Sequence, residues 1–211
     1  MSGRKDEFSL LEALLWEPGE GFFLLESHLD RLGRTARFFH RSLDLDGVRS
    51  RLEVASEDFT PERKKVRVEV GVGGDVFIES ESIVIQDAVT YAIATEPVEA
   101  SDPFLQHKTS RRAVYDRALA SHPGAEDVVL WNERDELTET CSANLVLDIG
   151  GRKLTPRPES GLLRGTFRDF LLEKGEIEEE VLPRDAMKEA RDVFLINSVR
   201  LWRLGIPMDP L

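Results

Sequence analysis

The segment PVEASDPFLQH, residues 97–107, divides this sequence into two parts that carry different patterns. It holds Pro97 and Pro103 among small polar residues, a composition typical of a connection because proline interrupts helices and sheets. A chain of 211 residues is long enough for two small domains, each with its own core. We therefore predict an N-terminal α+β domain over 1–96, an interdomain linker over 97–107 and a C-terminal domain over 108–211.

The part before the linker combines helical and strand-like patterns. An apolar run at 8–16, the turn residues Pro18–Gly21 and a second apolar run at 22–25 predict a hairpin. Apolar residues then recur at helical spacing, which predicts an amphipathic helix over 27–41 with Ser27 as its N-cap. Residues 65–95 alternate with period two, so we expect an antiparallel sheet there.

The part after the linker predicts a second mixture of helices and strands. The expected helices lie at about 111–120, from the glycine turn 161–165 to near Gly175, and at 184–190. The expected strands lie at 127–132, 136–140, 144–149, 152–155, 193–197 and 199–203. The fold class predicted for the whole chain is therefore α+β.

Composition excludes several classes of function. The formal net charge is −12, whereas proteins that bind nucleic acids need a basic face against the phosphates. The single cysteine, Cys141, rules out an intramolecular disulfide and argues against a structural zinc site, so we expect no metal. The sequence has no apolar run of about 18 residues that would span a membrane, and MSGRKDE at the N-terminus lacks the apolar core of a signal peptide. We expect a cytoplasmic protein.

Lys108 is the first candidate functional residue. It follows the linker directly and is flanked by His107, Thr109 and two arginines, Arg111 and Arg112. Neighbouring cations lower the pKa of a lysine, which favours its use as a Schiff-base nucleophile. The alternative is a solvated basic helix start, which is the more common situation for such a run.

A glycine turn that enters a helix is the second candidate. Leu163-Arg164-Gly165-Thr166-Phe167-Arg168 would present backbone N–H groups at the helix N-terminus, where phosphate binds. The alternative is an ordinary turn, because the motif is much shorter than the known phosphate-binding fingerprints.

The third candidate is a polar stretch in a region predicted to be a core strand pair, Leu137-Thr138-Glu139-Thr140-Cys141-Ser142-Ala143-Asn144. A buried Glu139 would need a hydrogen-bonding or cationic partner. The alternative is an edge strand whose polar side faces water.

Together, the order and spacing of these motifs resemble a known family. A lysine, then Glu-x-x-x-x-Asn, then Leu-x-Gly-x-x-Arg is similar to the fold-type IV pyridoxal 5'-phosphate (PLP) enzymes, the class IV aminotransferases. The resemblance extends to His28-Leu29-Asp30-Arg31-Leu32 and to Asn197-Ser198-Val199-Arg200. The runs HKTSRRAVYD at 107–116 and LWNE at 130–133 are most similar to the 4-amino-4-deoxychorismate lyase-like domains of that family.

The resemblance implies a role for each matching residue. Lys108 would form the Schiff base with PLP and transfer the proton at the substrate's α carbon. Glu139 would face the pyridine nitrogen, and Arg31 would pair with the cofactor phosphate. The remaining residues of the phosphate cradle would be Gly165, Thr166, Phe167, Asn197 and Ser198.

Three further residues have two interpretations. Tyr115 would contact the cofactor's phenolic oxygen, although helical spacing also places it in the core. Arg112 and Arg200 would bind substrate carboxylates, although each is equally compatible with a surface position. Cys141 is interpreted as a small buried apolar residue.

The resemblance implies two small domains with the cofactor in the cleft between them, in a homodimer that acts on an amino acid or amino-substituted acid. Its closest match suggests elimination of pyruvate to give 4-aminobenzoate, a step in folate biosynthesis, whereas transamination is the broader activity of the family. The sequence also departs from the family. No Gly-Asp-Gly precedes Phe8, no Gly-Arg-Gly-Tyr segment is visible at 67–78, and Glu12-Ala13-Leu14-Leu15 replaces Glu-Thr-x-Arg. Because the lyases use a threonine at the Ala13 position, transamination and a catalytically degenerate binding partner stay open as alternatives.

Overall fold

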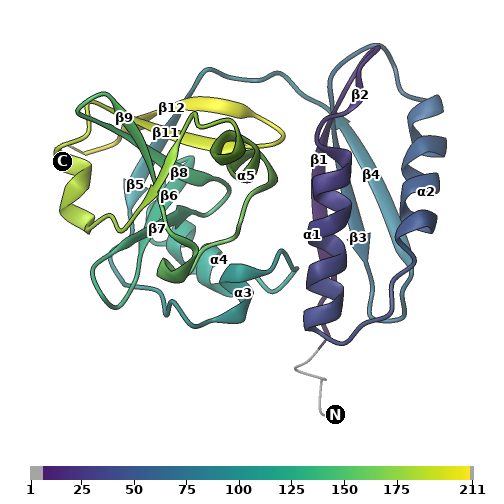
Figure 1. Cartoon of the computed structure of the whole chain (residues 1–211), viewed down its shortest axis with the longest axis horizontal. Coiled ribbons are helices and arrows are strands. Elements are labelled where there is room, and N and C mark those ends of the chain that lie inside the picture. Colours follow the sequence, from purple (N-terminus) through teal and green to yellow (C-terminus); the bar gives the residue numbers. More distant parts are fainter. Residues whose placement is uncertain (1–6, 210–211) are drawn as a thin grey trace. The chain divides into compact units, whose positions relative to one another are not determined.

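The computed structural model describes residues 7–209, which form two compact units (Figure 1). Within that range, the first unit contains residues 7–84 together with 107–111. The second unit contains residues 85–106 and 112–209. The chain therefore passes between the units after Val84, after Gln106 and after Arg111, whereas the sequence predicted one boundary segment at 97–107.

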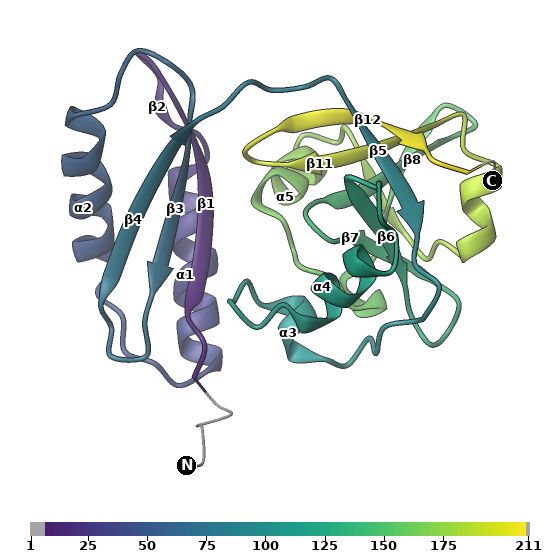
Figure 2. The same cartoon turned by 180° about the vertical axis from the view of Figure 1, so that it is seen from behind.

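The described part of the first unit is an antiparallel sheet with the strand order β2-β1-β3-β4, covered on one face by two helices (Figures 1 and 2). Its elements are β1 (Leu10–Glu17), β2 (Gly21–Phe22), α1 (Leu25–Phe38), α2 (Leu45–Glu57), β3 (Lys64–Val70) and β4 (Val76–Ser82). Apolar side chains of both helices and of one sheet face form its core, among them Leu14, Leu32, Leu52 and Val68. This arrangement confirms the predicted hairpin, helix and antiparallel sheet.

The helices of the first unit differ from prediction in two respects. Leu24, in the left-handed conformation with φ 55°, precedes α1, and no side chain caps that helix. Ser27 already lies inside α1, so its prediction as N-cap is wrong. Helix α2 was not predicted because its buried face is narrow, with only Val48 and Leu52 among its buried residues.

The described part of the second unit is an eight-stranded sheet that closes on itself. The strand order is β10-β9-β8-β11-β12-β5-β6-β7, and an additional pairing of β7 with β8 closes the ring. Its strands are β5 (Ala88–Ile93), β6 (Asp127–Trp131), β7 (Leu137–Thr140), β8 (Asn144–Ile149), β9 (Arg152–Pro156), β10 (Glu178–Glu180), β11 (Asp192–Asn197) and β12 (Leu201–Pro207). Its helical segments are α3 (Pro103–Gln106), α4 (Ala113–Ala120), η1 (Pro158–Ser160), α5 (Thr166–Glu173) and η2 (Arg184–Lys188).

The core of the second unit lies between its strands. Leu145, Leu147 and Leu195 alternate along β8 and β11 into this core, so the residues between them face the opposite side of the sheet. Helix α4 packs on that opposite side, where Tyr115 shares a second cluster with Val128 and Leu130. Most predicted strands are confirmed, whereas the helix expected at 184–190 is the short 3₁₀ segment η2.

Strand β5 lies in a different sheet from the one predicted. The alternation at 65–95 placed it with β3 and β4, but it pairs in parallel with β12 and with β6. Val89 and Tyr91 of β5 are buried in the core of the second unit. Burial of this apolar face against β6 and β12 outweighs the nearness of β5 to β4 in the sequence.

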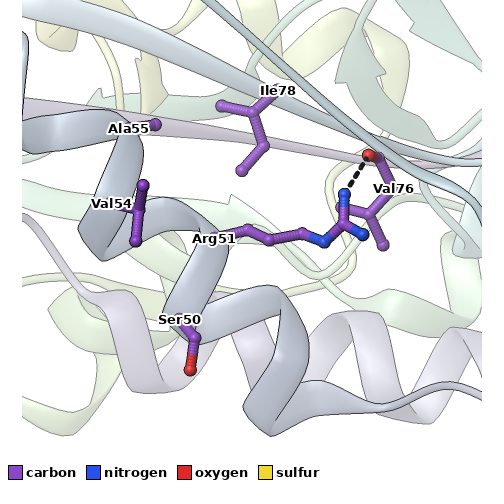
Figure 3. A pocket seen from close by; sticks show the side chains of 6 residues that line it. All are labelled: Ser50, Arg51, Val54, Ala55, Val76 and Ile78. Atoms are coloured by element: carbon purple, nitrogen blue, oxygen red, sulfur yellow. Dashed lines mark hydrogen bonds between the residues drawn. The ribbon is translucent and has the colours of Figure 1, made fainter.

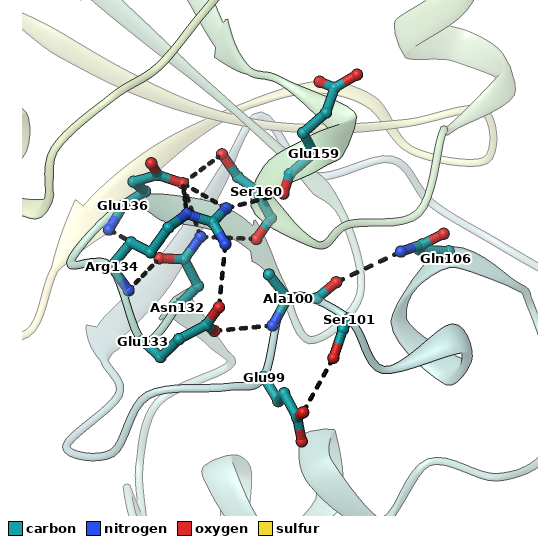
Figure 4. A network of polar contacts seen from close by, with 10 residues as sticks. All are labelled: Glu99, Ala100, Ser101, Gln106, Asn132, Glu133, Arg134, Glu136, Glu159 and Ser160. Carbon is teal, nitrogen blue, oxygen red and sulfur yellow. Dashed lines mark hydrogen bonds and ion pairs between the residues drawn. The ribbon is translucent and has the colours of Figure 1, made fainter.

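Residues 97–106 are fastened to the second unit rather than forming a free linker (Figure 4). The Val98 amide donates to the Trp131 carbonyl at 2.8 Å, and the Ala100 amide donates to Glu133 Oε2 at 2.9 Å. Gly161 has φ 89°, and a Cβ at this glycine would overlap the Ala100 backbone. The two prolines therefore mark a surface segment that packs closely on one unit.

Candidate functional site

Lys108 lies in the first unit, on a short segment that runs antiparallel to the start of β1. The Leu11 amide donates to the Lys108 carbonyl at 3.0 Å, and Leu10 forms a β-bridge with Thr109. The Ser110 amide donates to the Ser9 carbonyl at 2.9 Å. These bonds fix the backbone on both sides of Lys108, whose side chain is half-buried.

His107 holds the same segment against α1. Its ring lies 4.2 Å from the Phe38 ring and 5.3 Å from the Phe39 ring, measured between centroids. Its Nδ1 lies 3.2 Å from the Thr35 hydroxyl. Burial and the nearby Arg34 lower the pKa of His107. The sequence did not single out His107, although its place beside Lys108 was the available signal.

Arg31 takes part in a buried charge cluster. Its Nε and Nη2 donate to the two carboxylate oxygens of Glu12 at 2.8 and 2.6 Å, and His28 Nδ1 lies 2.7 Å from Glu12 Oε2. Burial alone would raise the pKa of Glu12, but Arg31 and His28 hold it well below its usual range. The sequence predicted Arg31 as a phosphate ligand without anticipating this partner.

Burial also acts on His28. It lowers the pKa of His28, with Arg31 and Lys108 acting in the same direction, although Glu12 opposes the shift. Lys108 thus lies close enough to this cluster for its charge to be felt there. The first unit brings Lys108, Arg31, Glu12 and His28 together.

Glu139 lies in the second unit on β7 and is 4% exposed, while Thr138 and Thr140 beside it are also buried. The alternative of a wet edge strand is therefore wrong. Strand β7 is irregular at this point, because Trp131 of β6 pairs with Leu137 but Val129 pairs with Thr140. Three steps along β7 oppose two along β6, which is the mark of a β-bulge. The extra residue allows Glu139 to face α4 although Leu137 points into the strand core.

Tyr115 of α4 meets Glu139 on that side of the sheet. Its hydroxyl donates to Glu139 Oε1 at 2.8 Å. Burial, and then the Glu139 charge, raise the pKa of Tyr115 well above its ordinary value. The guanidinium of Arg112 stands 4.5 Å from the centre of the Tyr115 ring and donates to the Cys141 carbonyl at 2.6 Å.

Asn144 connects Glu139 with the glycine turn. It pairs with Glu139 on β7 and with Ile196 on β11, and its Nδ2 donates to the Leu163 carbonyl at 2.8 Å. A Cβ at residue 165 would overlap the Asn144 Oδ1 atom, so this approach requires glycine. Gly165 is followed directly by α5, whose N-terminus has no side-chain cap. Thr166 and Phe167 form its first turn and are buried.

The turn after β11 carries the last predicted group. The Asn197 Oδ1 atom accepts from the amides of Val199 and Arg200 at 3.0 and 2.7 Å, and its Nδ2 donates to the Ser142 carbonyl at 3.2 Å. Ser198 is buried in this turn and Arg200 is half-buried. Asn144 pairs with Ile196 at the end of β11 and its side chain donates to Leu163, so it links this turn to the Gly165 turn.

One groove lies apart from these residues, whereas Cys141 lies next to Tyr115. A groove of about 380 Å³ between α2 and β4 is lined by Ser50, Arg51, Val54, Ala55, Val76 and Ile78, and contains none of the predicted site residues (Figure 3). Cys141 is buried, and burial raises the pKa of its thiol to about 12. Between residues 7 and 209 no cluster of His, Cys, Asp or Glu could hold a metal ion, and no helix is long and apolar enough to cross a membrane.

Comparisons with known proteins identify the family. The family model described as "Amino-transferase class IV" matches residues 9–204 of this chain. The "Putative aminodeoxychorismate lyase" of Schizosaccharomyces pombe is 32% identical over 212 residues, which cover 95% of this chain and 90% of that protein.

Two solved structures are similar over most of their length. The "Putative amino-acid aminotransferase" of Mesorhizobium loti is 29% identical with a TM-score of 0.88, over 95% of this chain and 100% of the other. A hypothetical aminotransferase of Mycobacterium tuberculosis in its PLP-bound form is 23% identical with a TM-score of 0.82, over 93% and 80%. The second likeness shows the fold alone.

Proposed function

Because this chain belongs to the class IV aminotransferases, a family of PLP-dependent enzymes, we propose that it is a 4-amino-4-deoxychorismate lyase. Such an enzyme eliminates pyruvate from its substrate and leaves 4-aminobenzoate. The observation that carries this choice is the 32% identity to the fission-yeast lyase-named protein over nearly the whole of both chains.

The residues present fit PLP. Its pyridine nitrogen needs a buried carboxylate, and Glu139 is one. Its phosphate needs N–H donors at a helix N-terminus, and the start of α5, which has no side-chain cap, would present them; Gly165 allows Asn144 to approach that turn closely. Asn144 pairs with Glu139 and its side chain donates to Leu163, which supports the proposal that both features serve one site.

In the second unit, Glu139 would keep a proton on the ring nitrogen. Gly165, Thr166 and Phe167 would hold the phosphate, together with the Asn197 and Ser198 turn. Arg200 lies three residues after Asn197 and would bind a substrate carboxylate. When bound, PLP supplies the electron sink that stabilises negative charge at the substrate's α carbon.

In the first unit, Lys108 would carry the cofactor covalently and, once released, take the proton from the α carbon. Its backbone bond to Leu11 and the packing of His107 would hold the main chain from which its amine extends. Arg31 would add its charge to the phosphate site while its bonds to Glu12 fix the direction of the guanidinium.

Transamination is the second candidate function. Ala13 on β1 has no hydroxyl, whereas the lyases use a threonine there for proton transfer to pyruvate. The Mesorhizobium loti protein named as an aminotransferase is also similar over its whole length. Both reactions begin with the same proton transfer at Lys108, and they differ in whether a leaving group departs afterwards.

One pair of assays separates the two reactions. Pyruvate release from 4-amino-4-deoxychorismate is measured beside 2-oxoglutarate-dependent transamination of a panel of amino acids, with PLP added. The lyase proposal expects pyruvate and 4-aminobenzoate in equal amounts. Transamination without pyruvate release would contradict it.

Lys108→Ala tests the role of the lysine, with Lys188→Ala as the control because Lys188 forms an exposed pair with Asp185. We expect Lys108→Ala to lose all activity and Lys188→Ala to keep the activity of the wild type. Borohydride reduction and peptide mapping should place the cofactor on residue 108. A protein that binds PLP nowhere would be the degenerate family member considered above.

Sedimentation of the holoenzyme tests the homodimer that we expect.

A further inference from the structure

Arg112, Tyr115 and Glu139 form a connected group on the outer side of the sheet in the second unit. The phenol of Tyr115 donates to Glu139 Oε1 at 2.8 Å, and Arg112 stands over the Tyr115 ring. Arg112 also donates to the Cys141 carbonyl at 2.6 Å, just beyond the end of β7. The group therefore joins α4 to both ends of the short segment 139–141.

The surroundings make the phenol an effective donor. Glu139 is 4% exposed and Tyr115 is 6% exposed, so water competes little for either group. A hydrogen bond to a carboxylate is stronger than one between neutral groups and favours the charged form. Because the pKa of Tyr115 is raised well above its ordinary value, the hydroxyl keeps its proton over the working range of an enzyme.

The bulge in β7 explains why the hydrogen bond from Tyr115 to Glu139 matters. Glu139 lies where the pairing of β6 with β7 is irregular, so its side chain gains a further constraint from a partner on α4. The Tyr115 hydroxyl supplies it to Glu139, and the cation of Arg112 holds the tyrosine ring by its face.

We propose that Tyr115 is a positioning residue that orients the Glu139 carboxylate and keeps it charged, with Arg112 supporting the Tyr115 ring. This inference rests on the proposed function, in which Glu139 serves the ring nitrogen. It gives Tyr115 and Arg112 work within the protein rather than direct contact with cofactor or substrate.

The hydrogen bond is tested first in the protein without cofactor. The chain has two tyrosines, so Tyr91→Phe leaves Tyr115 as the only one, and a ¹³Cζ-tyrosine label then gives a single NMR resonance. Adding Glu139→Gln should move that resonance, because the acceptor loses its charge. Adding Glu57→Gln, at an exposed position on α2, should not. An unmoved resonance in the Glu139 variant would overturn the proposal.

The functional consequence is tested in the loaded enzyme. Tyr115→Phe keeps the ring under Arg112 and removes only the donor, so kcat should fall about tenfold with little change in KM. Arg112→Gln should lower kcat by a smaller factor. Tyr91→Phe is the matched control, because the Tyr91 hydroxyl is buried with no hydrogen-bond partner among the described residues.

The outcomes separate the two proposals. An active wild type in which Tyr115→Phe behaves like Tyr91→Phe would overturn the positioning role alone. A wild type that takes up no PLP and has no activity would overturn the proposed function, and the positioning role with it.

Discussion

Glu12 and Glu139 are both buried carboxylates, one in each unit, and they accept hydrogen bonds from donors of different kinds. Glu12, 2% exposed, accepts two bonds from the Arg31 guanidinium and contacts His28. Glu139, 4% exposed, accepts from the phenol of Tyr115. An arginine brings a full charge to the carboxylate, whereas a phenol brings only a dipole.

The difference between these donors indicates that the two carboxylates have different roles. The charge cluster at Glu12 joins β1 to α1. Removing the Glu12 carboxylate would take this partner away from the buried Arg31. Glu139 accepts from the neutral Tyr115 phenol and pairs with Asn144, whose side chain holds the glycine turn of the proposed cofactor site. We therefore expect Glu12 to matter mainly for stability and Glu139 mainly for activity.

The largest expected effect on stability is that of Glu12→Gln. Glutamine takes a negative charge away from the buried Arg31 guanidinium, and breaking a buried ion pair costs about 3–5 kcal/mol of unfolding free energy. Urea denaturation of the protein without cofactor measures it. Glu26→Gln, which breaks the exposed pair with Arg49, is the control and should cost less than about 1 kcal/mol. Equal losses of unfolding free energy in Glu12→Gln and Glu26→Gln would contradict the structural role of the buried Glu12 cluster.

Acid should remove part of the same free energy. The pKa of Glu12 in the folded protein lies below its ordinary 4.5, so the unfolded chain takes up that proton first as the pH falls. The stabilisation is complete above about pH 4.5 and is lost below it. Unfolding free energies measured between pH 5.5 and 3.5 should therefore decrease more steeply in the wild type than in Glu12→Gln. Parallel curves would contradict the assignment.

The lowered pKa of His28 has the same sign. The unfolded chain protonates this histidine first below its ordinary 6.5, so stability should also fall as the pH passes downward through that value. His28→Gln should flatten the curve between pH 7 and 5.

Gly165→Ala should have an intermediate effect. The new methyl group would displace Asn144, whose Nδ2 holds the Leu163 carbonyl, at a cost of about 1–3 kcal/mol. It should also weaken PLP binding, because the start of α5 shifts. Calorimetry and PLP titration measure the two losses. Gly175→Ala provides a comparison outside the cradle, since only the strain of its positive φ applies there.

The smallest expected change in stability is that of Glu139→Gln. Glutamine keeps the Oε1 acceptor for Tyr115, so the unfolding free energy should change by less than about 1 kcal/mol. Turnover should nevertheless fall about 10- to 100-fold. A stability loss as large as that of Glu12→Gln would show that both carboxylates are structural.

Local patterns in the sequence were sufficient for most elements and for the family resemblance. Period-two alternation predicted β3 and β4, and the glycine turn before α5 lies where expected. The same pattern could not assign β5, because alternation shows that a strand is half-buried without identifying the strand it pairs with. The division of the strands between two sheets therefore could not be predicted from the sequence pattern.

The candidate site shows a similar limit. Helical spacing placed Tyr115 in the core, and its ring does lie there, but spacing says nothing about its hydroxyl. The direction of Glu139 depends on a bulge, which is set by the pairing of β6 with β7 rather than by local propensity. Arg31 and Glu12 are nineteen positions apart, so their pairing also required the folded arrangement of β1 and α1.

The position of β12 in the ring has a consequence for synthesis of the chain on the ribosome. Ala88 of β5 is paired with Leu204 of β12. The first strand of the ring therefore cannot complete its pairing until the last strand has left the ribosome. Until then the nascent chain exposes an edge of β5 and of β11, and such edges invite pairing with other chains. The larger unit should thus be the slower to fold and the one that most depends on chaperones.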